Sequence, residues 1–154
     1  MPIEIERKYL IANNDWEPLV INSFSIKQGY LNLAPERTVR VRIKENSAFI
    51  TIKGKTKGIC RAEFEYPIPL QEAVQLILLS EGSLIEKVRY EISYEGNIWE
   101  VDLFSGENKG LIIAEIELPS ESHHFKIPQW IGKEVSEDAR YYNANLVTTP
   151  YLNW

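Results

Sequence analysis

The sequence predicts a mainly β (α+β) domain: an antiparallel sheet of roughly eight strands, enough to close into a barrel, with a few peripheral helices. Most segments alternate apolar and charged side chains with a period of two, which is the pattern of strands with one apolar face. Short turns separate most of these segments, which favours antiparallel pairing. No repeat, low-complexity tract or linker interrupts the chain, so we expect one domain over residues 1–154.

The first predicted strand shows the alternation clearly, because Ile3 and Ile5 are interleaved with Glu4, Glu6 and Lys8. The same pattern recurs at residues 38–44, 49–53, 61–66, 87–92, 100–103 and 114–118. A less regular run at 25–33 completes the set. The stretch 106–110, rich in glycine, predicts a turn between two strands.

Helices are predicted over residues 16–21, 69–80 and 137–146. The middle one has apolar side chains at helical spacing, and Gly82 is placed to terminate it. Asp15 is a candidate cap for the first helix and Ser136 for the last.

Composition limits the class of protein. Of 154 residues, 44% are hydrophobic and 25% charged, which is ordinary for a globular domain. A single cysteine, Cys60, excludes an intramolecular disulfide and a cysteine-rich zinc site. The start of the chain lacks the apolar stretch of a signal peptide, and no apolar run reaches the ~18 residues of a membrane span. We therefore expect a cytoplasmic protein with no membrane partner. The net charge of −5 argues against nucleic acid as a partner.

Charges of one sign recur two residues apart. The acidic pairs are Glu4/Glu6, Glu63/Glu65, Glu100/Asp102 and Glu115/Glu117, and the basic pairs are Arg40/Arg42 and Lys87/Arg89. Side chains at this spacing share one face of a strand, about 7 Å apart. Paired carboxylates repel each other unless water or a cation lies between them, and their oxygens suit Mg²⁺ or Mn²⁺. Paired arginines can each grip an oxyanion with a planar fork.

Two interpretations of these charged faces remain open from the pattern alone. They can form the wet outer surface of an open sheet, with the aliphatic face as core. Alternatively, they can line the inside of a closed barrel, where acids and bases together would suit a polyanion and its metal ions. Segregation by sign favours the cavity, because solubility alone is served better by mixed charges.

The segment Glu4–Lys8 reads E-x-E-x-K and resembles the N-terminal hallmark of the CYTH proteins, also called triphosphate tunnel metalloenzymes. Further segments similar to the family pattern follow in order at residues 28–31, 40–42, 51–54, 63–66, 87–90, 99–104, 110–118 and 132–136. The resemblance covers nearly the whole chain and is nearest to the short, single-domain bacterial members.

This resemblance implies a closed eight-stranded antiparallel tunnel whose charged face is interior. It also implies a hydrolase that depends on Mg²⁺ or Mn²⁺ and takes a small-molecule triphosphate. Short bacterial members are similar to inorganic triphosphatases, which cut tripolyphosphate into pyrophosphate and phosphate. The alternatives are an adenylate cyclase, a thiamine or nucleoside triphosphatase of the same family, or a non-catalytic polyphosphate- or nucleotide-binding module. Either a monomer or a homodimer is compatible with the sequence.

The resemblance also assigns roles to residues. It implies metal ligands at Glu4, Glu6, Glu115 and Glu117. It implies phosphate-binding cations at Arg40, Arg42, Lys53, Lys87 and Arg89. Lys8 corresponds to the motif lysine near the scissile phosphate, so Lys8, Glu4 and Glu6 form the expected catalytic group. Interior carboxylates at Glu63, Glu65 and Asp102 either support the metal ligands or hold a second metal.

The remaining candidate functional residues have weaker support from the sequence. His123 and His124 are neighbours on a polar stretch and are expected in an exposed loop. Residues 53–58 lack the spacing of a phosphate-binding loop and predict a hairpin turn. Arg140 is a candidate substrate contact, because the family places this part of the chain near the tunnel.

Overall fold

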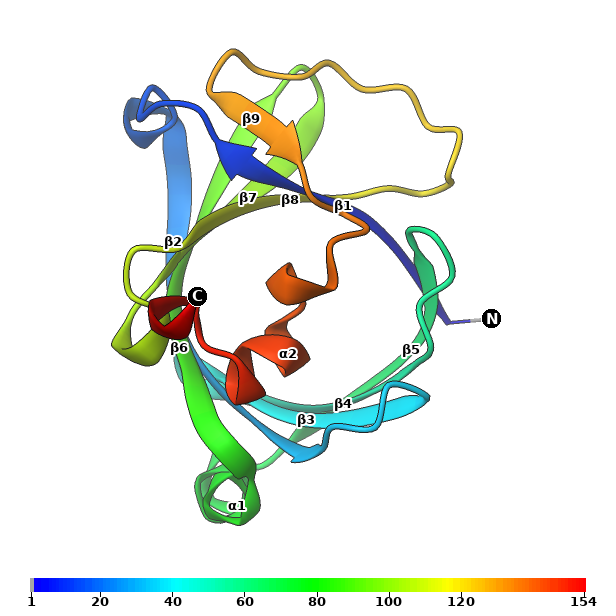
Figure 1. Ribbon diagram of the computed structural model, residues 1–154, viewed down its shortest axis with the longest axis vertical. Coiled ribbons are helices and arrows are strands. Elements are labelled where there is room, and N and C mark those ends of the chain that lie inside the picture. Colours follow the sequence, from blue (N-terminus) through cyan, green and yellow to red (C-terminus); the bar gives the residue numbers. More distant parts are fainter. Residues whose placement is uncertain (1) are drawn as a thin grey trace.

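The computed structural model describes residues 2–154 and shows a ring of strands seen end-on (Figure 1). The strands are β1 (Ile3–Ile11), β2 (Val20–Asn32), β3 (Arg37–Lys44), β4 (Ser47–Gly54), β5 (Cys60–Ile68), β6 (Glu81–Tyr94), β7 (Asn97–Phe104), β8 (Ile112–Glu117) and β9 (Ile131–Glu134). The α-helices are α1 (Leu70–Leu76) and α2 (Asn143–Thr148). Short 3₁₀ turns are η1 (Glu17–Leu19), η2 (Ile77–Leu79), η3 (Gly106–Asn108), η4 (Ala139–Tyr141) and η5 (Tyr151–Asn153).

Eight strands close into an antiparallel barrel in the order β5-β4-β3-β2-β6-β7-β8-β1. A pairing of β1 with β5 closes the ring, with Ile3 opposite Ala62 and Glu4 opposite Arg61. β9 pairs antiparallel with the C-terminal part of β1, with Tyr9 opposite Glu134. The predicted closed barrel is therefore confirmed. β9 is an addition, missed because four residues without clean alternation carry no strand signal.

Charged side chains point into the ring along most of its length, so most apolar side chains of the same strands point outward, and on two sides of the barrel other parts of the chain cover them. Trp99 on β7 is fully buried there, with its ring 5.5 Å from Tyr9 and 5.9 Å from Trp130. This cluster lies beneath β9 and the connection that precedes it. On another side, α1 covers Val41 of β3 and Ala48 of β4.

The C-terminal segment lies across one end of the ring, where α2 appears inside the circle of strands (Figure 1). Leu146 and Val147 of α2 pack with Ile85, Phe104 and Ile113, and this apolar cluster closes that end of the barrel interior. Polar side chains of the same C-terminal segment, among them Ser136 and Asn143, face the barrel interior.

The helix predictions were partly wrong. The predicted 69–80 helix is confirmed in outline, although its last turn is the 3₁₀ turn η2, and Gly82 lies within β6 at φ +67°. The predicted 16–21 helix is only η1, without a side-chain cap. Residues 137–146 form two short pieces, η4 and α2, because Tyr142 between them is extended at ψ 132°. Ser136 does not cap this segment; Asp138 caps η4 by accepting from the Arg140 backbone N–H.

No helix within residues 2–154 is long and apolar enough to cross a membrane.

Candidate active site

The inside of the barrel encloses a cavity of about 540 Å³ lined by charged side chains. Eleven of the predicted site residues line it: Glu4, Glu6, Lys8, Arg40, Arg42, Lys53, Glu63, Glu65, Arg89, Glu115 and Glu117. The structure thus resolves which face of the sheet is interior, because these residues come from β1, β3, β4, β5, β6 and β8 around the ring.

The acidic side of the cavity is built by three neighbouring strands. Glu6 on β1 lies opposite Glu117 on β8 in the strand register, and Glu115 on β8 lies opposite Glu100 on β7. Glu4 precedes Glu6 on the same face of β1 and is buried, with 7% of its surface exposed. Carboxylates from adjacent strands are therefore brought together, and Glu100 joins the predicted set as a cavity residue.

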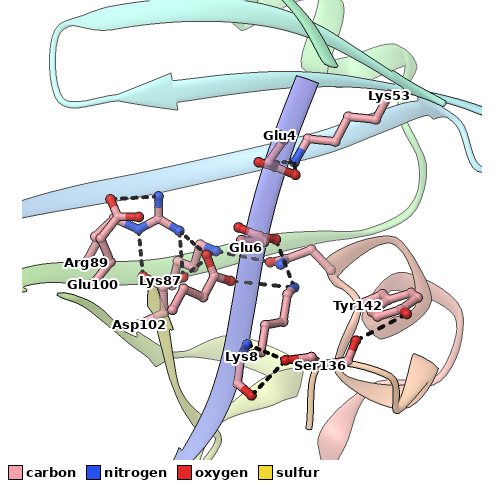
Figure 2. Close-up of polar contacts among 12 residues, drawn as sticks. Glu4, Glu6, Lys8, Lys53, Lys87, Arg89, Glu100, Asp102, Ser136 and Tyr142 are labelled. Carbon is pink, nitrogen blue, oxygen red and sulfur yellow. Dashed lines mark hydrogen bonds and ion pairs between the residues drawn. The ribbon is translucent and has the colours of Figure 1, made fainter. Parts of the chain in front are cut away.

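Two lysines of the site are paired with these acids (Figure 2). Lys53 on β4 donates to both carboxylate oxygens of Glu4, at 2.9 and 3.0 Å. Lys8 Nζ lies 3.5 Å from Glu115 Oε1 and 3.9 Å from Glu6 Oε1. Both ammonium groups therefore stand at the boundary between the acidic side and the rest of the cavity.

The arginines differ in how many of their donors are already used. Arg40 NH2 donates to Thr51 Oγ1 at 3.1 Å and to Glu65 Oε2 at 3.5 Å, and its other terminal nitrogen, NH1, makes no hydrogen bond within residues 2–154. Arg42 donates through Nε to Gln28 Oε1 at 2.8 Å, and its terminal nitrogens make no hydrogen bond within the described chain. These unused donors at the cavity wall are suited to bind an oxyanion.

Arg89, in contrast, is fully engaged. Its Nε and NH2 donate to the two oxygens of Asp102 at 2.8 and 2.9 Å, and NH1 donates to Glu100 at 3.3 Å. Burial would raise the pKa of Asp102, but the charges of Arg89 and Lys87 hold that pKa well below its usual range. Arg89 is thus fixed in direction by a buried carboxylate.

Two predicted site residues, Lys87 and Asp102, lie behind the cavity wall rather than on it. Lys87 Nζ is 2.7 Å from Asp102 Oδ2, and neither side chain has exposed surface. Burial lowers the pKa of Lys87 to about 8, although the nearby Asp102 carboxylate opposes that effect. In this geometry the pair supports Arg89 from behind.

The carboxylates fit a bound cation by their chemistry. Burial, together with the negative charges of Glu115 and Glu4, raises the pKa of Glu6 to about 7. Burial and the charges of Glu4 and Glu6 also raise the pKa of Glu117. Crowded oxygen donors of this kind are the ligands that hard divalent cations prefer. Within residues 2–154, no group of three or more such side chains is already arranged to hold a metal ion.

This crowding predicts an unusual dependence of stability on pH in the presence of a chelator. The folded protein keeps the Glu6 proton up to about pH 7, whereas the unfolded chain releases it near 4.5. Between these values the folded state binds more protons, so the free energy of unfolding should fall as pH rises, by at most about 3 kcal/mol. Urea denaturation of the wild type and Glu6→Gln at about pH 5 and pH 8 measures this.

The Glu6→Gln variant should lose most of the decline, because its amide does not titrate. Glu121→Gln, at an exposed loop position, is the control and should keep the decline. A wild-type protein equally stable at both pH values would contradict the assigned crowding.

Several lining residues were not predicted from the sequence. They are Tyr30, Thr38, Arg61, Ser136, Tyr142 and Asn143. Arg61 shared a strand face with Glu63 and Glu65, and that alternation was a usable signal. Ser136, Tyr142 and Asn143 reach the cavity only because the C-terminal segment folds across the barrel end, which no local pattern reveals.

The C-terminal segment holds the catalytic candidate Lys8 in place. Ser136 Oγ accepts from the Lys8 backbone N–H at 2.9 Å (Figure 2). The same hydroxyl donates to Glu134 at 2.6 Å. The Lys8 ammonium lies 5.7 Å from the centre of the Tyr142 ring, in a cation–π contact. This use of the Ser136 hydroxyl is the physical reason that it does not cap the following segment.

The weaker candidates lie elsewhere. Arg140 does not line the cavity and instead pairs with Asp138 on the surface, at 2.8 Å. His123 contacts Asn97 at 3.3 Å in the loop outside the barrel. Cys60 is a half-buried free thiol.

Comparison with known proteins fits this geometry. The family model of the CYTH domain matches residues 2–151. The chain belongs to the CYTH family. A CYTH relative named inorganic triphosphatase, from Acetivibrio thermocellus, is 46% identical over 152 residues, covering 98% of this chain and 97% of the relative. Another of that name, from Nitrosomonas europaea, is 35% identical over 149 residues, covering 93% and 95%.

Solved structures agree with the CYTH barrel. A crystal structure of an inorganic triphosphatase aligns with a TM-score of 0.67 at 34% identity, covering 94% of this chain and 97% of that one. A putative adenylate cyclase from Bacillus halodurans aligns with a TM-score of 0.58 at 21% identity, covering 79% and 83%. The second likeness shows the fold alone.

Proposed function

We propose that this chain is a divalent-metal-dependent inorganic triphosphatase, which hydrolyses tripolyphosphate to pyrophosphate and phosphate within a single domain. The observation that supports this most directly is one enclosed cavity with acids on one side and arginines with unused donors on another. The two relatives named inorganic triphosphatase, at 46% and 35% identity, agree with it.

We assign the metal site to Glu4, Glu6, Glu115 and Glu117, and the metal to Mg²⁺ or Mn²⁺. The oxygen donors and the raised pKa values of Glu6 and Glu117 support this assignment. When bound, such a cation would neutralise charge on the phosphoryl oxygens and lower the pKa of the attacking water. Glu63 and Glu65 face the same cavity and pair with Lys53 at 3.4 Å and with Arg40 at 3.5 Å, so we assign them to supporting these cations or to holding a second ion.

The phosphate oxygens are assigned to the cations of the cavity. Arg40 and Arg42 offer unused donors, while Lys8, Lys53 and Arg89 add positive charge. The transition state of phosphoryl transfer spreads negative charge over the oxygens. Fixed cations therefore stabilise the transition state more than they stabilise the bound substrate. Lys87 and Asp102 act through Arg89, whose direction they fix.

The reaction assigned to this site is direct attack of water. The water oxygen bonds to a terminal phosphorus, the bond to the bridging oxygen breaks in line, and pyrophosphate leaves, with one proton released to solvent. No covalent protein intermediate forms. A phosphorylated protein isolated during turnover would contradict this route.

Phosphate release tests the function. Tripolyphosphate, ATP, thiamine triphosphate and pyrophosphate are each supplied with Mg²⁺, with Mn²⁺ and with excess chelator. We expect metal-dependent release, fastest from tripolyphosphate. Cyclic AMP formed from ATP without phosphate release would instead identify a cyclase. Tripolyphosphate binding without turnover under any condition would identify a binding module.

A further inference from the structure

Asn143, the first residue of α2, forms part of the cavity wall and is anchored from behind. Its Oδ1 accepts hydrogen bonds from Lys87 Nζ at 3.1 Å and from Gln28 Nε2 at 3.2 Å. Both donors are buried, with 3% and 0% of their surfaces exposed. The side chain of Asn143 therefore cannot rotate without breaking two hydrogen bonds from buried donors, one of which, Gln28 Nε2, has no other acceptor within residues 2–154.

Chemistry alone fixes which way the Asn143 amide faces. Arg42 donates to Gln28 Oε1 at 2.8 Å, and a guanidinium has no acceptor, so the Nε2 of Gln28 must face Asn143. The ammonium of Lys87 is also a donor only. Both neighbours therefore require an oxygen, and exchange of the Asn143 oxygen and nitrogen would set donors against donors.

The other half of the amide, Nδ2, consequently points away from these anchors. It donates to no acceptor within residues 2–154, although Asn143 lines the cavity. We propose that Asn143 Nδ2 is a substrate-binding group that donates a hydrogen bond to a phosphate oxygen of the bound polyphosphate. This inference rests on the proposed function and adds a neutral donor of fixed direction to the cations already assigned.

The test is the Asn143→Asp variant, which has nearly the same shape. Its carboxylate still accepts from Gln28 and Lys87, but an oxygen replaces the donor. A residue with only a structural role would tolerate this change, since Lys87 would gain a second carboxylate partner beside Asp102. If Asn143 donates to phosphate, the carboxylate of the Asn143→Asp variant repels the substrate instead. We then expect kcat/KM for tripolyphosphate to fall about 100-fold or more, chiefly through a higher KM.

A second variant and a matched control separate charge from contact. Asn143→Ala removes the donor without adding charge, and we expect a fall of about 10- to 100-fold. Thr148→Asp adds the same charge at an exposed position of the same helix, outside the cavity. It should remain within about threefold of wild type, which is the size of a distant, screened charge effect.

Binding is measured separately from KM, as the inhibition constant of pyrophosphate and by calorimetry with tripolyphosphate. Asn143→Asp should weaken both, with a thermal midpoint equal to or above that of wild type. Unchanged kcat/KM, or a fall in kcat with KM and the pyrophosphate constant unchanged, would overturn the inference. If wild type binds tripolyphosphate without hydrolysing it, the proposed function fails, yet binding by the variant still tests Asn143. A wild type that binds no polyphosphate overturns both.

Discussion

Replacing Glu4 and Glu6 together by glutamine is expected to abolish metal-dependent phosphate release from tripolyphosphate, with a loss of at least about 10³-fold. The two side chains lie on one face of β1 among the other acids of the cavity. Glutamine preserves their shape but removes two negative charges from the assigned metal site. Steady-state phosphate release across a range of Mg²⁺ and Mn²⁺ concentrations measures the loss.

The matched control for this variant is Glu121→Gln with Glu137→Gln, which removes the same charge from exposed positions. We expect the control to retain wild-type activity. Calorimetric titration with Mn²⁺ should show binding to the control protein and none to the cavity variant. Full activity of the cavity variant would remove Glu4 and Glu6 from the assigned metal site.

Replacing Asp102 by alanine is expected to lower the free energy of unfolding by about 3–5 kcal/mol. Asp102 is fully buried and is the shared partner of Lys87 and Arg89. Its removal leaves two buried cations without their main counter-charge, which costs far more than the lost hydrogen bonds. Urea denaturation at neutral pH measures the change.

Asp138→Ala is the control, because it breaks another aspartate–arginine pair, with Arg140, at the surface. Water replaces that ion pair and only the cap of the short turn η4 is lost with it, so the denaturation midpoint should fall much less than for Asp102→Ala. Asp102→Asn, which keeps the shape and one acceptor, should fall between wild type and Asp102→Ala. Equal midpoints for Asp102→Ala and wild type would show that Lys87 and Arg89 find other partners.

The barrel strands were predictable because their signal is local. The alternation of apolar and charged side chains is visible in short stretches such as Val39–Lys44 and Glu63–Tyr66, and this pattern alone predicts a strand with one apolar face. Whether the charged face lies inside depends on closure, which is a property of the whole ring; only the family resemblance predicted it. The predicted bounds of the C-terminal helix were wrong because Ser136 bonds to the Lys8 backbone instead of capping a helix, and because Tyr142 is extended.

The site was predictable to the same extent. Charged residues at a spacing of two on a strand must share a face, so most of the cavity lining followed from the strands. The alternation does not predict how deeply each side chain is buried. Lys87 and Asp102 belong to the same pattern as Arg89 and Glu100, yet they lie behind the cavity wall. Asn143 had no sequence signal, since its place depends on a helix that crosses the end of the barrel.

The outward orientation of the apolar side chains separates two requirements that most enzymes must meet with the same residues. Two of the three apolar clusters of this molecule lie outside the ring, around Trp99 and beneath α1, and the third closes one end of the interior, whereas the charged side chains that line the cavity belong to none of them. Substitutions among the lining side chains that are not tied to the buried Asp102 can therefore alter the preferred substrate while leaving the apolar packing intact. A scaffold of this kind is suited to diversification, and the same property makes its interior a convenient place to engineer new anion specificity.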